Sequence, residues 1–298
     1  MTAGSILAGA FGLVRERPGA VAVWALVYLA ASVGVALAMR PLLGTFAQLS
    51  GAAAPSPDEM STAMARLVLV EMAFVAVVIA LFAAAQRAVL RPAQQGFAFL
   101  RLGMDELRMF GLALLFLILF YFGLIVATLV LGLLAVLVGV VAGAAAVVPL
   151  VVVEVIALLA ALFWLQVRLS LAFPLTMLRG KIVIGESWQR TRGRFWSLFG
   201  AFFLLFLLVL AMWIPVALVG SGGYFADLVN SGFTPEGVQR AGERQMARQF
   251  GTPDPTMMIG WALGAVVGTL GIALFSGAAA TAARELTDDV EGLAETFA

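Results

Sequence analysis

The sequence contains no cysteine and no histidine, and only 12% of its 298 residues are charged. Disulfides, thiolate nucleophiles, zinc sites and histidine-based acid–base pairs are therefore excluded. Since most common catalytic centres need one of these groups, we expect no enzyme activity, no bound metal and no cofactor.

The sequence also lacks a strong excess of either charge, with a net charge of +1. Nucleic-acid binding needs a basic surface with interleaved aromatic side chains, and no such run is present. We therefore expect no nucleic-acid partner.

Hydrophobic residues make up 63% of the chain, whereas roughly half is typical of a soluble domain. A helix needs about 20 apolar residues to cross a bilayer. The expected fold is all-α, a polytopic integral membrane protein with one six-span membrane domain. The predicted transmembrane helices are about 19–39, 67–86, 109–135, 149–168, 195–217 and 257–283.

Basic residues set the expected orientation. The stretch 163–200 joins two apolar spans, and short loops rich in Lys and Arg are cytoplasmic. Its basic residues are Arg168, Arg179, Lys181, Arg190, Arg192 and Arg194. Both termini are then cytoplasmic, 221–256 is an extracytoplasmic loop, and 284–298 is an acidic cytoplasmic tail. The expected location is the bacterial inner membrane.

Three segments have the apolar periodicity of interfacial amphipathic helices. They are an N-terminal helix from Ser5, a helix over 93–108, and a helix over about 183–193. In the first, the residues predicted to face lipid are Ile6, Leu7, Ala10, Phe11, Leu13 and Val14.

Several sequence signals predict where helices begin and end. Ser56-Pro57-Asp58-Glu59 is a capping box, and Thr234-Pro235-Glu236 begins a helix that ends near Gly251. The run from Met109 to Gly139 exceeds one upright crossing, so its helix is expected to tilt or to stop before the turn at Gly139–Gly143. Pro215 is expected to kink or end the fifth span.

The segment 185–196 reads GESWQRTRGRFW and leads directly into the fifth span. Glu186 can pair with Arg190 at i,i+4. Because arginine offers a two-pronged donor to phosphate, anionic lipid headgroups or a phosphate ligand are candidate partners. The candidate binding residues are Arg168, Arg190, Arg192 and Arg194. The alternative is a purely structural helix that sets the tilt of the fifth span.

This segment, together with Arg168-Leu169-Ser170 and Pro174 before it, resembles the membrane domain at the amino-terminal side of some bacterial glycerophosphodiester phosphodiesterases. A wider group of six-span bacterial membrane proteins is similar to it. In that family a separate soluble barrel carries the phosphodiesterase activity. The 14 residues after Arg284 leave no room for such a barrel, so we do not expect this activity.

Glu71 and Glu154 are the two carboxylates predicted to lie well inside spans. Intramembrane carboxylates are uncommon and often functional, and similar depth would allow a shared site. Alternatively, each reaches outward to water or to Arg66.

Gly260, Gly264 and Gly268 repeat at the spacing that lets helix backbones approach closely. This face is expected to pack within the chain or against a second copy or another membrane protein.

Two functions fit these patterns. The first is a non-enzymatic multi-pass protein, a scaffold or accessory in lipid or envelope homeostasis with membrane lipids as partners. The alternative is an ion-coupled transporter that uses Glu71 and Glu154.

Overall fold

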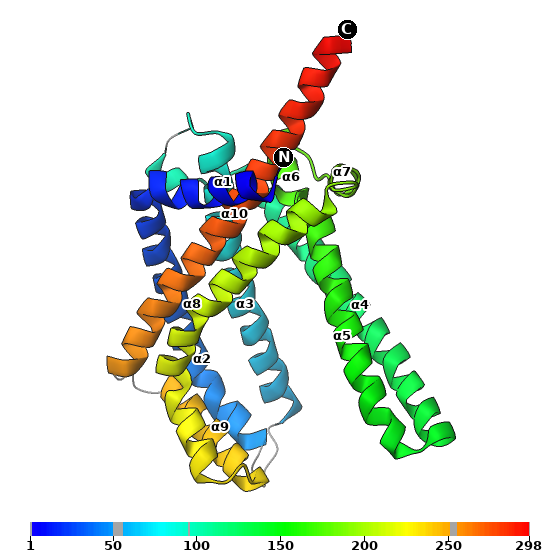
Figure 1. Cartoon of the computed structure of the whole chain (residues 1–298). Helices are drawn as coiled ribbons and strands as arrows, with labels where there is room; N and C mark the ends of the chain where they lie inside the picture. The colour runs from blue at the N-terminus through cyan, green and yellow to red at the C-terminus, as the bar shows by residue number, and fades with distance from the viewer. Residues whose placement is uncertain (1, 50–55, 95, 251–254, 298) are drawn as a thin grey trace. The chain divides into compact units, whose positions relative to one another are not determined.

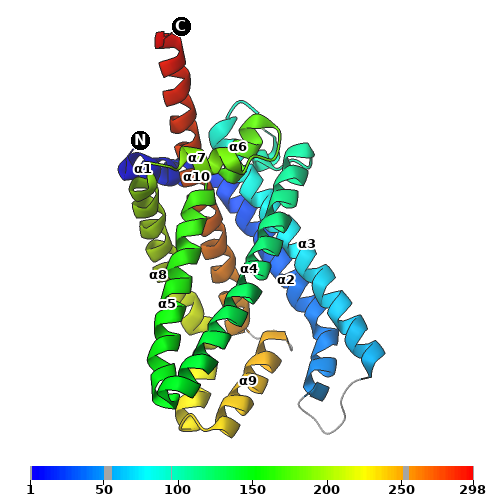
Figure 2. The same ribbon diagram turned by 90° about the vertical axis from the view of Figure 1, so that its right-hand side faces the viewer.

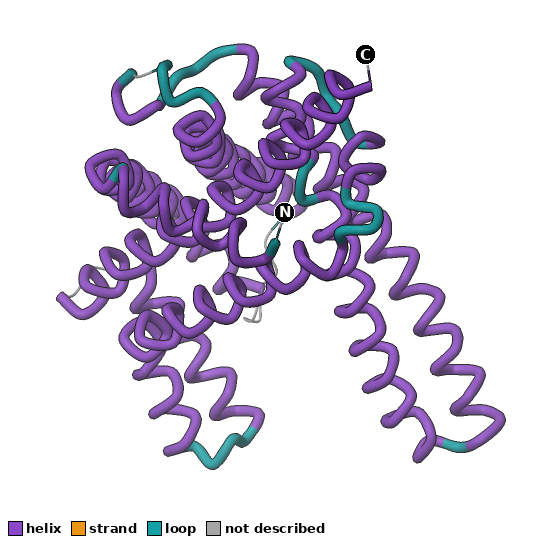
Figure 3. Tube along the Cα trace, turned by 45° about the horizontal axis from the view of Figure 1, so that its top comes forward, coloured by secondary structure: helices purple, strands orange, loops and turns teal. Residues whose placement is uncertain are grey.

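The computed structural model describes residues 2–49, 56–94, 96–250 and 255–297. All regular structure in these ranges is helical, as the purple tube in Figure 3 shows. The elements are α1 (Ala3–Glu16), α2 (Pro18–Leu49), α3 (Pro57–Leu90), the 3₁₀ turn η1 (Phe97–Phe99), α4 (Met104–Ala142), α5 (Ala144–Leu169), α6 (Ala172–Arg179), α7 (Gly185–Arg190), α8 (Phe195–Asn230), α9 (Pro235–Phe250) and α10 (Pro255–Phe297).

Six of the helical segments in the described ranges are long and apolar enough to cross a membrane. They are Pro18–Leu42, Pro57–Leu90, Phe97–Ala142, Ala145–Arg179, Phe195–Asn230 and Pro255–Thr287. The chain is thus an all-helical, multi-pass membrane protein, as its composition predicted.

The chain divides into two compact units, which are described separately. The first unit contains Met1–Gly9, Leu102–Phe202 and Ala278–Ala298. The second unit contains Ala10–Arg101 and Phe203–Gly277.

In the first unit, α4 and α5 form a hairpin and run side by side (Figure 1). The turn is Gly143, whose φ of 86° favours glycine. The helix does not stop short of the turn, because α4 continues to Ala142. Its first turns instead pack on α6, with Phe116 against Phe173 and with Met109 and Leu112 fully buried. The other alternative, a tilted helix, stays a prediction.

In the second unit, α2 and α3 run side by side (Figure 2). Their contact surfaces hold a buried core around Trp24, Leu81 and Ala84, to which Phe99 and Ala273 of α10 also contribute. Helix α3 begins with the predicted capping box: the Ser56 hydroxyl accepts from Glu59 N, and Glu59 Oε2 accepts from Ser56 N. This prediction is confirmed, as is the helix that begins at Pro235.

The predicted interfacial helix over 93–108 is wrong. Only η1 forms in that range before α4 begins at Met104. Ala98 and Phe99 both have positive φ, and their carbonyls accept hydrogen bonds from Trp24 Nε1 at 2.8 Å and Arg87 NH1 at 2.6 Å. These two buried donors come from α2 and α3, so tertiary contacts outweigh the local amphipathic pattern.

The predicted lipid-facing side of α1 also needs correction. Ile6, Ala10 and Leu13 are buried, whereas Phe11 is half exposed. Within the first unit Gly9 lies against Thr281, and within the second unit Ala10 and Leu13 lie against Gly277. Part of the apolar face therefore packs on α10 rather than facing lipid.

Two helices are longer than predicted. Pro215 lies inside α8 and does not end it, because the helix continues to Asn230. Helix α10 continues through the predicted acidic tail to Phe297. The tail's side chains beyond Thr287 lie outside the described residues.

Candidate functional site

The candidate site lies at the corner where α5, α6, α7 and the start of α8 meet in the first unit. Gly180 ends α6 with a left-handed φ of 63°, and its N–H donates to Thr176 O. Gly193, with a φ of 82°, redirects the chain from α7 into α8. These glycines allow the chain to turn after α6 and again after α7, so that both short helices lie next to the end of α5. We call this region the α5–α8 corner.

Two buried hydroxyls attach α7 to the end of α5. Ser187 Oγ and Thr191 Oγ1 both donate to the Arg168 carbonyl, at 3.1 Å and 3.3 Å. The last carbonyls of a helix lack intrahelical partners, so these bonds satisfy one of them. They also hold α7 beside the end of α5. The structure thus confirms a short helix within 183–193, although it is limited to Gly185–Arg190.

Aromatic rings surround the Arg168 guanidinium. Its central carbon lies 5.6 Å from the Trp164 ring centroid, 5.4 Å from Trp188 and 5.9 Å from Phe195. Cation–π contacts stabilise such a cation, more so when it is desolvated. Arg168 Nε and NH1 are nevertheless buried without a hydrogen-bond partner among the described residues. Three aromatic faces can attract the charge, but Nε and NH1 are left without an acceptor among the described residues.

The aromatic residues extend from the corner onto the surface. Trp164 and Trp188 meet edge to face with centroids 5.3 Å apart, and Phe195 contacts Phe199. Trp196 is 78% exposed. Amphipathic aromatic rings are enriched where membrane meets water. The corner therefore has the composition of an interfacial site.

Glu186 joins two arginines at the same corner. Its Oε1 accepts from Arg179 NH2 at 3.1 Å and Arg190 NH2 at 2.6 Å, which confirms the predicted Glu186–Arg190 pair. Burial alone would raise the pKa of Glu186, but the hydrogen bond from Arg179 and the charges of Arg190 and Arg179 outweigh it and lower the pKa.

Arg190 is also bound to α10. Its NH1 donates to Leu286 O at 3.1 Å and to Thr287 Oγ1 at 3.2 Å, and only 14% of its side chain is exposed. This predicted phosphate-binding residue therefore has internal acceptors. Arg192 differs, because it is exposed and its guanidinium has no partner among the described residues. Arg194, which follows Arg192 after one glycine, is partly buried.

Sequence reasoning missed the roles of Ser187, Thr191 and Trp164. Ser187 and Thr191 are four residues apart and so lie on one helix face, which is a polar signal within an apolar stripe. Nothing local shows that both hydroxyls reach the carbonyl of Arg168, which is 19 residues before Ser187.

The two carboxylates predicted to lie within the membrane fall in different units, Glu71 on α3 and Glu154 on α5. Glu71 is exposed, and no hydrogen bond or ion pair joins it to Arg66 among the described residues. Glu154 is partly buried, and its Oε1 has no partner there. The shared site stays a prediction.

The predicted small-residue face of α10 packs within the second unit. Gly260 approaches Gly220 of α8, Gly264 approaches Val216 and Trp213, and Gly268 lies against Tyr28 of α2. The chain's own helices thus cover these positions. Association with a second copy or another membrane protein stays a prediction.

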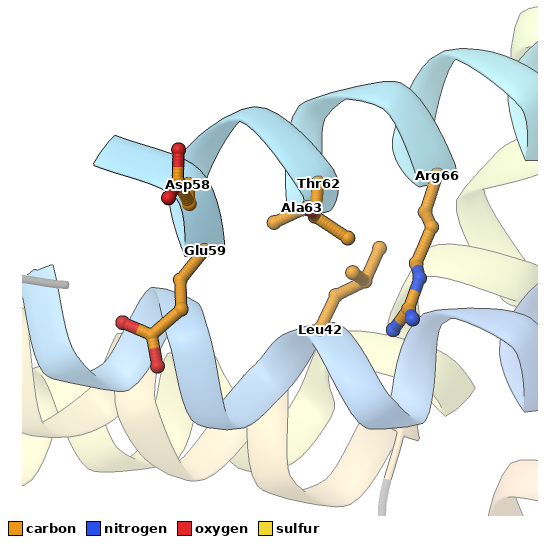
Figure 4. Close-up of a pocket in the computed structure, with 6 residues that line it drawn as sticks. All are labelled: Leu42, Asp58, Glu59, Thr62, Ala63 and Arg66. Carbon is orange, nitrogen blue, oxygen red and sulfur yellow. The ribbon is translucent and has the colours of Figure 1, made fainter. Parts of the chain in front are cut away.

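A pocket of about 340 Å³ lies at one end of the α2–α3 pair (Figure 4). Glu59 and Arg66 point from α3 toward α2, and Leu42 reaches up from α2 between them. Glu59 is already bound to Ser56 in the capping box. The pocket therefore presents both acidic and basic side chains, and the acidic Glu59 is already used in capping α3. No group of His, Cys, Asp and Glu among the described residues could hold a metal ion.

Comparisons with protein-family models, with curated proteins and with solved structures find no match. The resemblance of 185–196 to the phosphodiesterase membrane domain therefore stays a prediction.

Proposed function

We propose that this chain is a multi-pass protein of the bacterial inner membrane that binds anionic lipid headgroups at the α5–α8 corner. It would act without catalysis, as a scaffold or accessory in lipid or envelope homeostasis. The observation that supports this proposal is the Arg168 guanidinium, which is surrounded by aromatic rings and has two buried, unpaired nitrogens.

A buried charge without hydrogen bonds is costly, so an acceptor at Arg168 would be strongly favourable. Phosphate is the natural acceptor, because its oxygens match the planar guanidinium and carry the opposite charge. The surrounding indoles favour the membrane–water interface, which is where a lipid phosphate lies.

The neighbouring cations add a less specific attraction. Arg192 and Lys181 are exposed at the corner, and each basic side chain near an anionic membrane surface contributes about 1 kcal/mol. Anionic lipids give the cytoplasmic leaflet its negative potential, which agrees with the sidedness that the basic loops predict.

The test compares Arg168→Gln with the native protein in nanodiscs that contain phosphatidylglycerol and phosphatidylcholine. We expect the enrichment of phosphatidylglycerol, measured by mass spectrometry of bound lipid, to fall about fivefold, the equivalent of ~1 kcal/mol. Arg168→Lys, which keeps the charge but loses the two-pronged geometry, should give an intermediate value.

Arg66→Gln is the matched control, because it removes the same charge from an exposed arginine of the second unit, on α3. Arg190 is left unchanged, since its loss would disturb Glu186 and α10 as well. Equal enrichment in Arg168→Gln and Arg66→Gln would reject the headgroup site.

An ion-coupled transporter is the second candidate, and the unpaired Glu154 Oε1 favours it. A carboxyl group among Val, Leu and Ile can bind and release a proton only with a partner or water, as in proton relays. In proteoliposomes with an internal pH dye, Glu154→Gln and Glu71→Gln should each abolish proton uptake. The exposed control Glu243→Gln should keep it, and absence of uptake by the native protein would reject a proton-coupled carrier.

A further inference from the structure

The second unit contains a pocket of about 400 Å³ among α2, α8, α9 and α10. Its wall includes Tyr28, Trp213 and Trp261, together with Gly264, Ser221 and Gln245. Cavities of this size lie within the range that binds small molecules. The pocket is independent of the α5–α8 corner, since its residues all belong to the other unit.

Small residues bring α8 and α10 close together beside this space. A Cβ added at Gly260 would lie 3.8 Å from Gly220 Cα, and one added at Gly264 would lie 3.7 Å from Val216 Cγ1. Helix α10 thus contributes no side chain at these two positions, while the indoles of Trp213 and Trp261 border the pocket. Trp213 and Ala217 are exposed, so the pocket is accessible from the outer side of α8.

Helix α9 contributes Gln245 to the pocket wall. Gln245 Nε2 donates to Gly220 O at 2.9 Å, which attaches α9 directly to the pocket wall. Arg244 and Arg248 of α9 also bind Asp227 of α8, at 3.0 Å and 3.4 Å. The contact is local, because α8 and α9 are joined by a tight turn in which Gly232 has a positive φ.

The lining is amphipathic but carries no charge. Tyr28 and Ser221 offer hydroxyl groups, and the amide oxygen of Gln245 accepts no hydrogen bond from the described residues. A phosphate or ammonium group would lose hydration here without a counter-ion, which is costly. An uncharged ligand would avoid this loss of hydration. Its alkyl chain would pack against the indoles, and its neutral oxygen atoms would lie near Ser221 and Gln245.

We infer that this pocket binds an uncharged lipid of the diacylglycerol class. Its acyl chain lies along Trp213 and Trp261, and its hydroxyl or ester oxygens face Ser221 and Gln245. The lipid enters from the bilayer on the exposed side of α8.

The test uses the full-length protein in phosphatidylcholine nanodiscs that contain a small fraction of diacylglycerol with a photoreactive acyl chain. After irradiation, peptide mass spectrometry should find the label concentrated on 213–221 and 257–265. Phosphatidylglycerol with the same photoreactive chain should label these peptides about tenfold less, because its charged head does not match the lining.

Gly264→Leu fills the pocket and should reduce diacylglycerol labelling about tenfold, since the ligand loses most of its contact surface. Gly34→Leu is the matched control, because Gly34 lies on α2 with open space around it and does not line the pocket. Ala217→Trp fills the pocket from an exposed position and provides a second variant if Gly264→Leu fails to fold. Labelling that is equal for both lipids, or unchanged by the filling variants, would overturn the assignment.

Discussion

The α4–α5 hairpin and helix α10 are both long and apolar, yet their surroundings differ. In the apolar 18-residue stretch that identifies α4 as a membrane helix, no residue is buried. In the corresponding stretch of α10, 39% of the residues are buried. Gly111, Gly123 and Gly132 of α4 have open space where a side chain would lie. Gly268 and Gly277 of α10 instead lie against Tyr28 and Ala10. Hydropathy identifies both as membrane helices, but close contacts at small residues distinguish the packed helix from the exposed one.

The first prediction tests whether lipid covers the α4–α5 hairpin. The chain has no native cysteine, so single substitutions can be labelled cleanly. Leu129→Cys, at a highly exposed position on α4, should be unreactive to a maleimide in nanodiscs and reactive in detergent-denatured protein, because the reacting thiolate does not form in hydrocarbon. Lys181→Cys should be labelled in both conditions. Equal labelling of the two positions in nanodiscs would contradict a lipid-covered hairpin.

The same approach tests the predicted sidedness. In intact cells an impermeant maleimide should label Ser56→Cys, while Gln189→Cys, on the exposed side of α7, should be labelled only after lysis. Ser187 is unsuitable because it is buried and bonded to Arg168 O. Labelling of Gln189→Cys from outside would reverse the orientation.

The second prediction concerns the close contact between α1 and α10. A Cβ added at Gly9 would lie 2.7 Å from Cβ of the buried Thr281. Gly9→Ala should therefore destabilise the protein by about 1–3 kcal/mol, as overpacking usually does. The loss should appear in reversible unfolding by SDS titration. Native stability in this variant would show that α1 does not pack tightly on α10.

The third prediction is the opposite effect in the exposed hairpin. Gly123 lies within α4, and nothing lies within 4 Å of an added Cβ. Gly123→Ala should stabilise the protein by roughly 0.5–1 kcal/mol, because alanine loses less conformational entropy on folding than glycine. The same SDS titration measures this gain in the free energy of unfolding. Destabilisation would mean that another helix, from this chain or a second copy, covers Gly123.

The sequence was sufficient to predict features that depend on neighbouring residues. The six apolar runs, the Ser56 capping box and the Glu186–Arg190 pair each depend on residues within one helix or one turn. The η1 turn could not be predicted, because its donors, Trp24 and Arg87, are distant in sequence. Likewise, the aromatic rings around Arg168 come from three helices. The pattern in α1 showed an apolar face, but only the fold determines that α10 covers part of it.

The smallest predicted effect concerns the charged contacts that hold the end of α10. Glu186 orients Arg190, which donates to Leu286 O and Thr287 Oγ1. The folded protein lowers the pKa of Glu186, so its contribution is fully present above the ordinary carboxyl pKa and is lost as the pH falls through the folded value. The native melting temperature should therefore fall on acidification below about pH 4.5.

Glu186→Gln removes this titration, and its melting temperature should depend less on pH in that range. At neutral pH the loss should be below about 1 kcal/mol, because the pair with Arg179 is partly exposed and screened by solvent. Glu243→Gln, an exposed carboxyl change on α9, should keep the native acid dependence. If Glu186→Gln and the native protein lose equal stability on acidification, Glu186 does not stabilise this contact. The end of α10 would then be held mainly by the close packing at Gly9, as its membrane-embedded part is held at Gly268 and Gly277.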